Sequence, residues 1–334
     1  MVYLSFRSVA ALLLLSLSTI SLATPISINA TDVEAQAVSR LYYLDQREGR
    51  IQSCKPDGTD TKTIATELRS VPDGIAVDRA AGLIYFSNMG RSAGSGARGS
   101  IQSVKLDGTG LATIVAVGKT HTAKQLTLAT VGGKKMLYWG DREGMKVMRC
   151  NVDGSGLEVV VDTAGAKCAG SPQCKHVVGV AVDAENGFVY WTQKGGSSAG
   201  EGSIHRAGIS LPAGATAASR PDVQNLLTGL PEPIDLRWVK ETGTLYWTDR
   251  ATSPGGNSVN RLQIANGASP VQISATKQML FNGIGAGIGI AVDVAGKQLW
   301  ATSLNGGLYS SDLEGKGKKQ IGRGLGLLVG IDFA

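Results

Sequence analysis

The chain has 334 residues, 43% hydrophobic and 18% charged, which is enough to form one large folded domain. Its formal charge of +6 comes from scattered basic residues, and only Lys316, Lys318 and Lys319 form a short cluster. Aromatic residues make up 5% of the chain, too few to build a base-stacking platform, so we expect no nucleic-acid partner.

The N-terminal segment is typical of a secretory signal. One basic residue, Arg7, precedes an almost unbroken run of apolar and small residues that ends at Ala23. This order predicts cleavage near Ala23 and a secreted protein. The run is short for a bilayer span of about 20 residues, so we expect no membrane span. Asn29 begins a glycosylation sequon. The expected organisation is a signal peptide (1–23), an exposed leader (24–39) and one folded domain (40–334).

The four cysteines are interpreted in the light of secretion, which favours disulfides. Cys168 and Cys174 close the small loop CAGSPQC, whose Gly and Pro let the chain turn back, and this predicts a disulfide. No Cys-x-x-Cys and no nearby His has zinc-like spacing, so we predict no metal site.

A six-residue phrase recurs along the chain. Its copies are LYYLDQ (41–46), IYFSNM (84–89), LYWGDR (137–142), VYWTQK (189–194), LYWTDR (245–250) and LWATSL (299–304). One aromatic residue of each copy recurs every 43 to 56 residues, at Tyr43, Phe86, Trp139, Trp191, Trp247 and Trp300. Periods near 50 residues with β-type composition indicate propeller blades rather than helical solenoids.

Each repeat contains the strands of one blade. A run such as GIAVD (74–78) comes first, then a tight turn, the phrase, a strand such as GRIQSC (49–54), and a fourth strand. The chain enters at the second strand of a blade, and LLVGIDFA (327–334) resembles the missing first strand. The predicted fold is all-β: a six-bladed β-propeller closed by the C-terminal strand, which leaves no open sheet edge.

LYWTD at 245–249, together with LDGT-like turns after the third strands, resembles the signature of YWTD β-propellers, which occur in lipoprotein-receptor ectodomains and in secreted single-domain proteins. The resemblance covers about residues 40 to 334. We expect the aromatic residues to pack between blades, and Asp45, Asp141 and Asp249 to bind backbone N–H groups. Cys54 and Cys150 fall on third strands a whole blade apart, beyond the roughly 7 Å Cα limit of a disulfide, so we expect buried free thiols.

The two faces of the predicted disc differ. One carries the turns between first and second strands and between third and fourth strands, and these turns are tight. The other carries the second-to-third loops and the crossings between blades, and we expect function there because long loops on a rigid scaffold usually bind ligands. Its expected long loops are 90–99, 162–176, 194–202, 251–258 and 275–287.

Ionisable residues are predicted to gather at the channel on the long-loop face. His121 and His176 lie in crossings between blades, and histidine titrates near neutral pH. In the fifth inner strand Asp235 takes a Gly place and Arg237 an Ala place, which requires mutual neutralisation or a ligand. The expected catalytic residues are His121, Lys124, His176, Asp235 and Arg237. The expected ligand-binding residues at the mouth are Asp73, Met279, Phe281 and Asn282.

Several familiar catalytic motifs are absent from the sequence. There is no Gly-x-Ser-x-Gly, no phosphate-binding Gly-x-x-x-x-Gly-Lys and no His-Glu-x-x-His. The run GIGAGIG (283–289) leads into a predicted strand rather than a helix, so it lacks the helix N-terminus that binds pyrophosphate. We therefore predict no cofactor.

The layout of a secreted single-domain propeller resembles fungal hetero-Diels–Alderases of tropolone–sesquiterpene biosynthesis. That resemblance implies dehydration of a hydroxymethyl tropolone to a quinone methide, followed by [4+2] addition to a humulene-type alkene, in a monomer that binds apolar small molecules. Such a reaction needs an aligning pocket and an acid or base rather than a metal. A protein- or glycan-binding module and a metal-dependent hydrolase of lactones or glycoside-like substrates remain as alternatives.

Overall fold

The computed structural model describes residues 39–90, 96–252 and 255–334. The predicted signal peptide, the leader up to residue 38 and the sequon at Asn29 lie outside the described residues.

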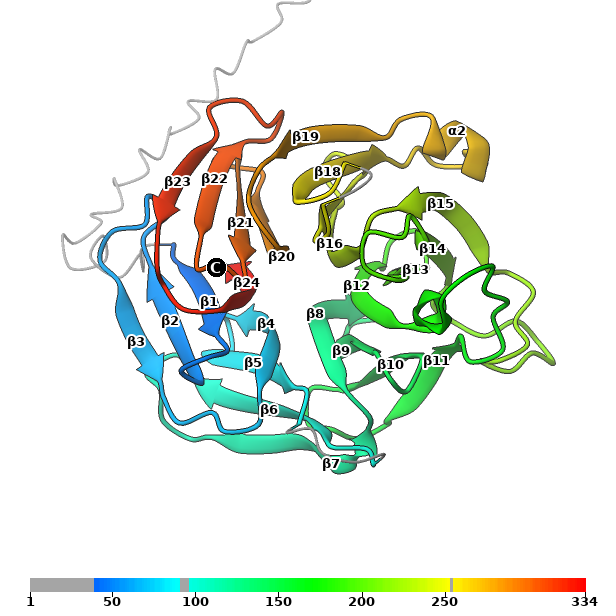
Figure 1. Cartoon of the computed structure of the whole chain (residues 1–334). Helices are drawn as coiled ribbons and strands as arrows, with labels where there is room; N and C mark the ends of the chain where they lie inside the picture. Colours follow the sequence, from blue (N-terminus) through cyan, green and yellow to red (C-terminus); the bar gives the residue numbers. More distant parts are fainter. Residues whose placement is uncertain (1–38, 91–95, 253–254) are drawn as a thin grey trace, which may run out of the picture. The chain divides into compact units, whose positions relative to one another are not determined.

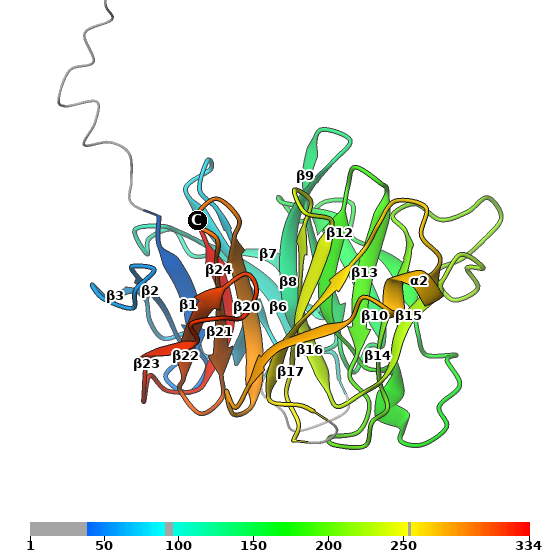
Figure 2. The ribbon, with the colours of Figure 1, turned by 90° about the horizontal axis from the view of Figure 1, so that it is seen from above.

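Six four-stranded antiparallel sheets surround a central axis (Figure 1). Figure 2 shows the same blades edge-on, with their strands running from one face of the disc to the other. From the innermost strand outward, blade 1 is β24 (Leu328–Phe333), β1 (Leu41–Asp45), β2 (Arg50–Cys54) and β3 (Lys62–Ala65). Blade 2 is β4 (Pro72–Asp78), β5 (Leu83–Asn88), β6 (Gly99–Lys105) and β7 (Ala112–Thr120). Blade 3 is β8 (Ala123–Val131), β9 (Lys134–Asp141), β10 (Lys146–Asn151) and β11 (Glu158–Asp162).

The second half of the ring repeats the same plan. Blade 4 is β12 (Val177–Asp183), β13 (Phe188–Gln193), β14 (Gly202–Gly208) and β15 (Gln224–Leu230). Blade 5 is β16 (Pro233–Val239), β17 (Thr244–Asp249), β18 (Ser258–Gln263) and β19 (Gln278–Asn282). Blade 6 is β20 (Gly287–Asp293), β21 (Gln298–Ser303), β22 (Leu308–Asp312) and β23 (Lys319–Gly322). Two short helices lie in connections: the 3-10 helix η1 (Pro172–Lys175) and α2 (Pro270–Ser274).

The C-terminal strand closes the ring, as predicted. In Figure 1 the red β24 lies beside the blue β1, and the two strands pair antiparallel from Leu41 opposite Phe333 to Asp45 opposite Leu328. The backbone N–H of Arg40 donates to the carbonyl of Ala334 at 2.7 Å. The two ends of the described chain therefore share one blade.

The recurring phrase forms the second strand of each blade. Its six aromatic residues are at most 1% exposed, so their rings form part of the buried core around the disc. The Trp300 indole also donates to the carbonyl of Pro56, which links blade 6 to blade 1. Asp249 accepts the N–H of Glu232, and Asp45 and Asp141 likewise hold the crossing that precedes the innermost strand of their own blades. The predicted structural role of the phrase is confirmed.

The innermost strands meet closely around the axis, which explains the glycine in their GIAVD-like sequences. A Cβ atom at Gly74, Gly179, Gly289 or Gly330 would approach the backbone of the next inner strand to between 2.2 and 2.6 Å. Such contacts are too short for any larger residue without a backbone shift.

The cysteines are placed as predicted. Cys168 and Cys174 form a disulfide with their Cα atoms 5.8 Å apart, whereas Cys54 and Cys150 are free and buried. Burial raises the pKa of Cys54 to about 11 and that of Cys150 to about 12, so both remain protonated thiols near neutral pH.

One loop prediction is wrong. Residues 275–287 are not a single long loop, because 278–282 form β19, the outermost strand of blade 5. The face expected to hold only tight turns also carries two long third-to-fourth connections, 209–223 in blade 4 and 264–277 in blade 5, the second of which contains α2.

Candidate functional site

The channel is closed by the second residue of each innermost strand. Val178, Ile234, Ile288 and Val329 lie in one buried cluster. The equivalent places in β4 and β8 hold Asp73 and Lys124. We call these six residues the axial ring. An ion pair therefore replaces two aliphatic side chains in an otherwise apolar plug.

Lys124 and Asp73 are joined across neighbouring blades. The Lys124 Nζ lies 2.7 Å from Asp73 Oδ1 and 3.2 Å from the Met89 sulfur, and the Gln125 amide donates to Asp73 Oδ2 at 3.2 Å. Burial lowers the pKa of Lys124, and the attraction of Asp73 opposes that shift. The structure thus brings two of the predicted site residues together.

A second layer of charge lies beside the axial ring on the long-loop face, at blades 3 to 5. These residues follow a second strand or precede an inner strand, the chain positions that the topology sends to this mouth. We call the following set the charged rim: Arg142, Glu143, His176, Lys194, Glu232 and Arg250.

Glu232 organises one half of the charged rim. Its carboxylate is fully buried and contacts Lys194 at 2.7 Å and the Arg250 Nε at 3.1 Å. Burial alone would raise the pKa of Glu232, but the two cations outweigh it and the pKa lies below its usual value. This buried triad fixes the ends of blades 4 and 5 at the mouth.

His176 lies in the other half, where Glu143, Arg142 and Lys194 act on it electrostatically. Burial lowers the pKa of His176, the two cations lower it further, and Glu143 opposes the shift. Burial raises the pKa of Glu143, but Thr122 and Arg142 outweigh burial and bring it below the usual value. Both shifts favour a neutral imidazole and an ionised Glu143 carboxylate at neutral pH. The His176 Nδ1 is buried and has no hydrogen-bond partner, so it is available to accept or pass on a proton.

The axial ring and the charged rim together carry a small excess of positive charge. Asp73, Glu143 and Glu232 supply three negative charges, and Lys124, Arg142, Lys194 and Arg250 supply four positive charges. Over these two sets alone, with His176 neutral, the positive charges exceed the negative charges by one; Asp141 and Asp249, which hold crossings at the same mouth, lie outside both sets. The cluster of cations favours a ligand with an anionic oxygen.

The remaining predicted catalytic residues lie elsewhere along the channel or on its margin. His121 is held in its crossing by a backbone hydrogen bond to Asp141 at 2.7 Å, and its Nδ1 is buried without a partner. Arg237 forms an ion pair at 3.0 Å with Asp332 of the closing strand rather than with Asp235.

Asp235 is held by the backbone. Its carboxylate accepts the N–H groups of Leu236 and Ile290, which ties β16 to β20, and burial raises its pKa to about 7. Asp235 and Arg237 therefore hold neighbouring blades together, deeper in the channel than the axial ring.

The predicted positions of Met279, Phe281 and Asn282 are wrong. All three lie on β19, the outermost strand of blade 5, and not at the channel. Phe281 packs in the core between blades 5 and 6, Met279 is 45% exposed, and Asn282 is exposed at the end of the strand. A fourth strand that buries so few side chains lacks the alternating pattern that would have revealed it.

Sequence reasoning missed most of the charged rim, although the repeat contained the signal. The sixth letter of the phrase is basic in three successive copies, at Arg142, Lys194 and Arg250. In the other copies it is Gln46, Met89 or Leu304. Because that position follows the second strand in every blade, the register alone places all three cations at one mouth.

Three cavities open on the opposite, tight-turn side of the blades. They have volumes of about 320, 400 and 500 Å³ and lie at blades 3 to 6. Among the residues that the structure describes, no group of three or more His, Cys, Asp or Glu is arranged to hold a metal ion. Within the same residues, no helix is long and apolar enough to cross a membrane.

Comparison with known proteins gives the family. The chain is 44% identical over 317 residues to a Pyricularia oryzae protein named Low-density lipoprotein receptor-related protein 1, covering 90% of this chain and 99% of that protein. It is also similar in fold to a chain in a crystal structure of a nidogen/laminin complex, with a TM-score of 0.66, 17% identity and coverage of 89% of this chain and 98% of that chain. The chain belongs to the YWTD-type β-propeller family.

A second fungal relative is more distant. A Cochliobolus heterostrophus protein named 3-hydroxyacyl-CoA dehydrogenase-like protein LAM1 is 33% identical over 305 residues, which cover 86% of this chain and 63% of that protein. No protein-family model matches the sequence. The glycine-rich run 283–289 enters β20 and not a helix, so this part of the chain does not form a dinucleotide-binding turn.

Proposed function

We propose that the protein is an enzyme of fungal secondary metabolism that handles an apolar small molecule with one acidic oxygen at the charged rim. The observation that carries the proposal is the buried His176 Nδ1, which has no hydrogen-bond partner and lies where Glu143, Arg142 and Lys194 act on the imidazole electrostatically. A proton acceptor of this kind suits general acid–base catalysis near neutral pH.

The reaction proposed is that of a hetero-Diels–Alderase. The His176 imidazole takes the proton from the acidic ring hydroxyl of a hydroxymethyl tropolone and delivers a proton to the hydroxyl of the hydroxymethyl arm. The C–O bond of that arm then breaks, so that water leaves and a quinone methide forms. The cations Arg142 and Lys194 stabilise the anionic oxygen as it develops. The [4+2] addition to a humulene-type alkene then needs only alignment of the two partners over the apolar part of the axial ring.

The reaction can be tested with purified protein, the hydroxymethyl tropolone and the alkene. We expect the protein to accelerate the cycloaddition and to narrow the product ratio relative to the spontaneous reaction, whereas His176→Ala slows it by about 100-fold, the usual size of a lost acid–base group. If wild-type protein leaves both the rate and the product ratio of the spontaneous reaction unchanged, the enzyme proposal fails.

A binding module is the second candidate. The name of the Pyricularia relative, Low-density lipoprotein receptor-related protein 1, supports it. In that case the charged rim binds a partner and catalyses no reaction. His176→Ala then changes the affinity for that partner and has no effect on the rate of the cycloaddition.

A further inference from the structure

Three neighbouring blades carry the same tyrosine–arginine pair at the same register. In each blade the tyrosine of the phrase strand lies opposite an arginine of the third strand. The pairs are Tyr138 with Arg149, Tyr190 with Arg206, and Tyr246 with Arg261. The pairs in blades 3 and 5 can therefore be compared directly with the middle pair, Tyr190 and Arg206 of blade 4.

The outer two arginines have carboxylate partners. The Arg149 Nε lies 2.6 Å from Glu158 Oε1 on the adjacent strand β11. Arg261 in blade 5 lies 3.5 Å from a carboxylate oxygen of Glu314, contributed by the third-to-fourth turn of blade 6. Each guanidinium thereby has a counter-ion from the protein itself.

Arg206 in blade 4 has no carboxylate partner among the described residues. Its Nε donates to Gln224 Oε1 at 2.7 Å and its Nη2 donates to the carbonyl of Ala268 at 3.3 Å, both of which are uncharged acceptors. Gln224 occupies the register place that Glu158 occupies in blade 3. Arg206 is only 6% exposed, so the fold holds a buried cation without the anion that its neighbours possess.

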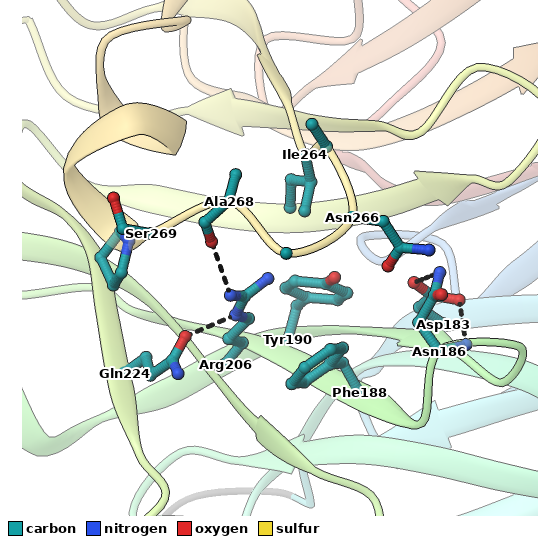
Figure 3. Close-up of a pocket in the computed structure, with 13 residues that line it drawn as sticks. Asp183, Asn186, Phe188, Tyr190, Arg206, Gln224, Ile264, Asn266, Ala268 and Ser269 are labelled. Carbon is teal, nitrogen blue, oxygen red and sulfur yellow. Dashed lines mark hydrogen bonds between the residues drawn. The ribbon is translucent and has the colours of Figure 1, made fainter.

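This arginine lines a cavity of about 320 Å³ between blades 4 and 5, shown in Figure 3. The Phe188 ring covers the guanidinium at 4.5 Å, and Ile264 and Pro270 add apolar surface. In Figure 3 the Tyr190 ring lies between Arg206 and Asn266.

Tyr190 lies beside this arginine. Its side chain is fully buried, and Arg206 acts on its hydroxyl as Arg149 acts on the equivalent Tyr138 hydroxyl, which accepts from Arg149 at 3.2 Å. Burial raises the pKa of Tyr190 to about 12, so the hydroxyl is protonated and able to donate. The cavity thus contains a cation and a hydroxyl donor at its apolar wall.

We propose that this cavity binds a small monocarboxylate with an aromatic or other flat apolar body. The carboxylate supplies Arg206 with the counter-ion that Glu158 provides for Arg149 and Glu314 provides for Arg261, and the body lies along Phe188 and Ile264. Asp183 lines the far side of the cavity, already bound to the Asn186 amide at 2.8 Å, and its charge disfavours a second anionic group on the ligand. The volume suits about ten to fifteen heavy atoms.

The site opens on the tight-turn side of the blades, whereas the charged rim lies on the long-loop face. Binding here is therefore independent of the function proposed above, and each can fail without the other.

Titration calorimetry with phenylacetate as the probe tests the site, with phenylacetamide as its neutral counterpart. We expect phenylacetate to bind at least about tenfold more tightly, because only the carboxylate forms charge-assisted hydrogen bonds with Arg206.

The internal controls separate binding from folding. Gln224→Glu supplies Arg206 with the carboxylate that Arg149 already has, so this variant should fold normally and lose phenylacetate binding by about tenfold or more. Gln278 bonds to Arg261 at 2.9 Å in the same register one blade away, so Gln278→Glu should leave binding unchanged. Equal affinity for phenylacetate and phenylacetamide, or full phenylacetate binding by the folded Gln224→Glu variant, would overturn the proposal.

Discussion

At the scale of single residues, the sixth residue of the phrase determines the charge of the channel mouth. The first five residues of the phrase build the second strand, and they are buried in all six copies. The sixth follows the strand and faces the mouth, and it is basic in blades 3, 4 and 5 only. One side of the mouth is thus cationic, while the other carries Leu304 and Leu327. A substrate with an acidic oxygen and an apolar body matches that division.

The ion pair in the axial ring gives a stability prediction. Lys124→Val alone leaves the buried Asp73 carboxylate without its cation, which should lower the free energy of unfolding by about 3 to 5 kcal/mol. Adding Asp73→Val completes the aliphatic ring seen in the other four blades and should restore most of that loss. Urea unfolding of the two single variants and the double variant measures both effects. Additive losses in the double variant would show that the pair is not coupled.

His205 gives a pH prediction. It stacks on Trp191 at 5.4 Å and bonds to Ser203 through Nε2 at 2.8 Å, in the place that Gln52 and Gln102 occupy in blades 1 and 2. Burial lowers the pKa of His205 from 6.5 to about 4. The unfolded chain therefore takes up this proton first as the pH falls, so the folded state loses stability between pH 6.5 and 4, by up to about 3 kcal/mol.

His205→Gln removes that titration and keeps a polar side chain natural to the site. The difference in unfolding free energy between wild type and variant should shift in favour of the variant as the pH falls from 7 to 4. Other titrating groups contribute equally to both proteins and cancel in the difference. A difference that stays constant over this range contradicts a neutral, buried His205.

At the scale of elements, the closing strand is the part on which the ring depends most. Leu328, Val329 and Ile331 of β24 are buried, and its Asp332 neutralises Arg237 of blade 5. Deleting residues 327–334 should abolish the cooperative thermal transition, because blade 1 then lacks its innermost strand. Moving the same eight residues in front of residue 40 through a tight turn should restore it, since Arg40 and Ala334 are already hydrogen-bonded. A normal transition in the deleted chain would contradict closure by β24.

The disulfide makes a smaller contribution. It closes a loop with a sequence separation of 6 beside His176, and the Gln193 amide donates to the Cys174 carbonyl at 2.6 Å. Replacing both cysteines by serine should lower the unfolding free energy by about 2 kcal/mol in the chain-entropy model. Calorimetry of the two proteins checks the size. Wild-type stability in the variant would show that the hydrogen bonds alone hold this crossing.

The repeat explains which elements could be predicted. The phrase and the GIAVD-like runs are buried on both sides, so their sequences are tightly constrained and reveal the first three strands and the closure. β19 buries mainly Phe281 and carries no such constraint, so its residues were mistaken for a loop. The partners of Arg237 and Glu232 come from other blades or from connections, and such pairings depend on three-dimensional geometry that no local pattern encodes.

At the scale of the whole molecule, the two faces divide the proposed roles. The long-loop face has the charged rim above a closed apolar axis, and the opposite face has cavities between blades. A rigid ring fixed by β24 holds both faces in place, so a change at one face should leave the other intact. The catalytic proposal places the reaction at the charged rim alone.

The most direct test of that claim compares two single substitutions at opposite mouths of the channel. His176→Asn changes the charged rim, and Lys240→Gln removes an exposed cation, paired with Glu185 at 2.8 Å, from the opposite mouth. The measurement is the initial rate of tropolone–humulene cycloaddition by each folded protein. We predict that His176→Asn lowers the enzyme-dependent rate by about 100-fold and that Lys240→Gln keeps the wild-type rate. A wild-type rate in His176→Asn, with or without a loss in Lys240→Gln, would contradict catalysis at the charged rim.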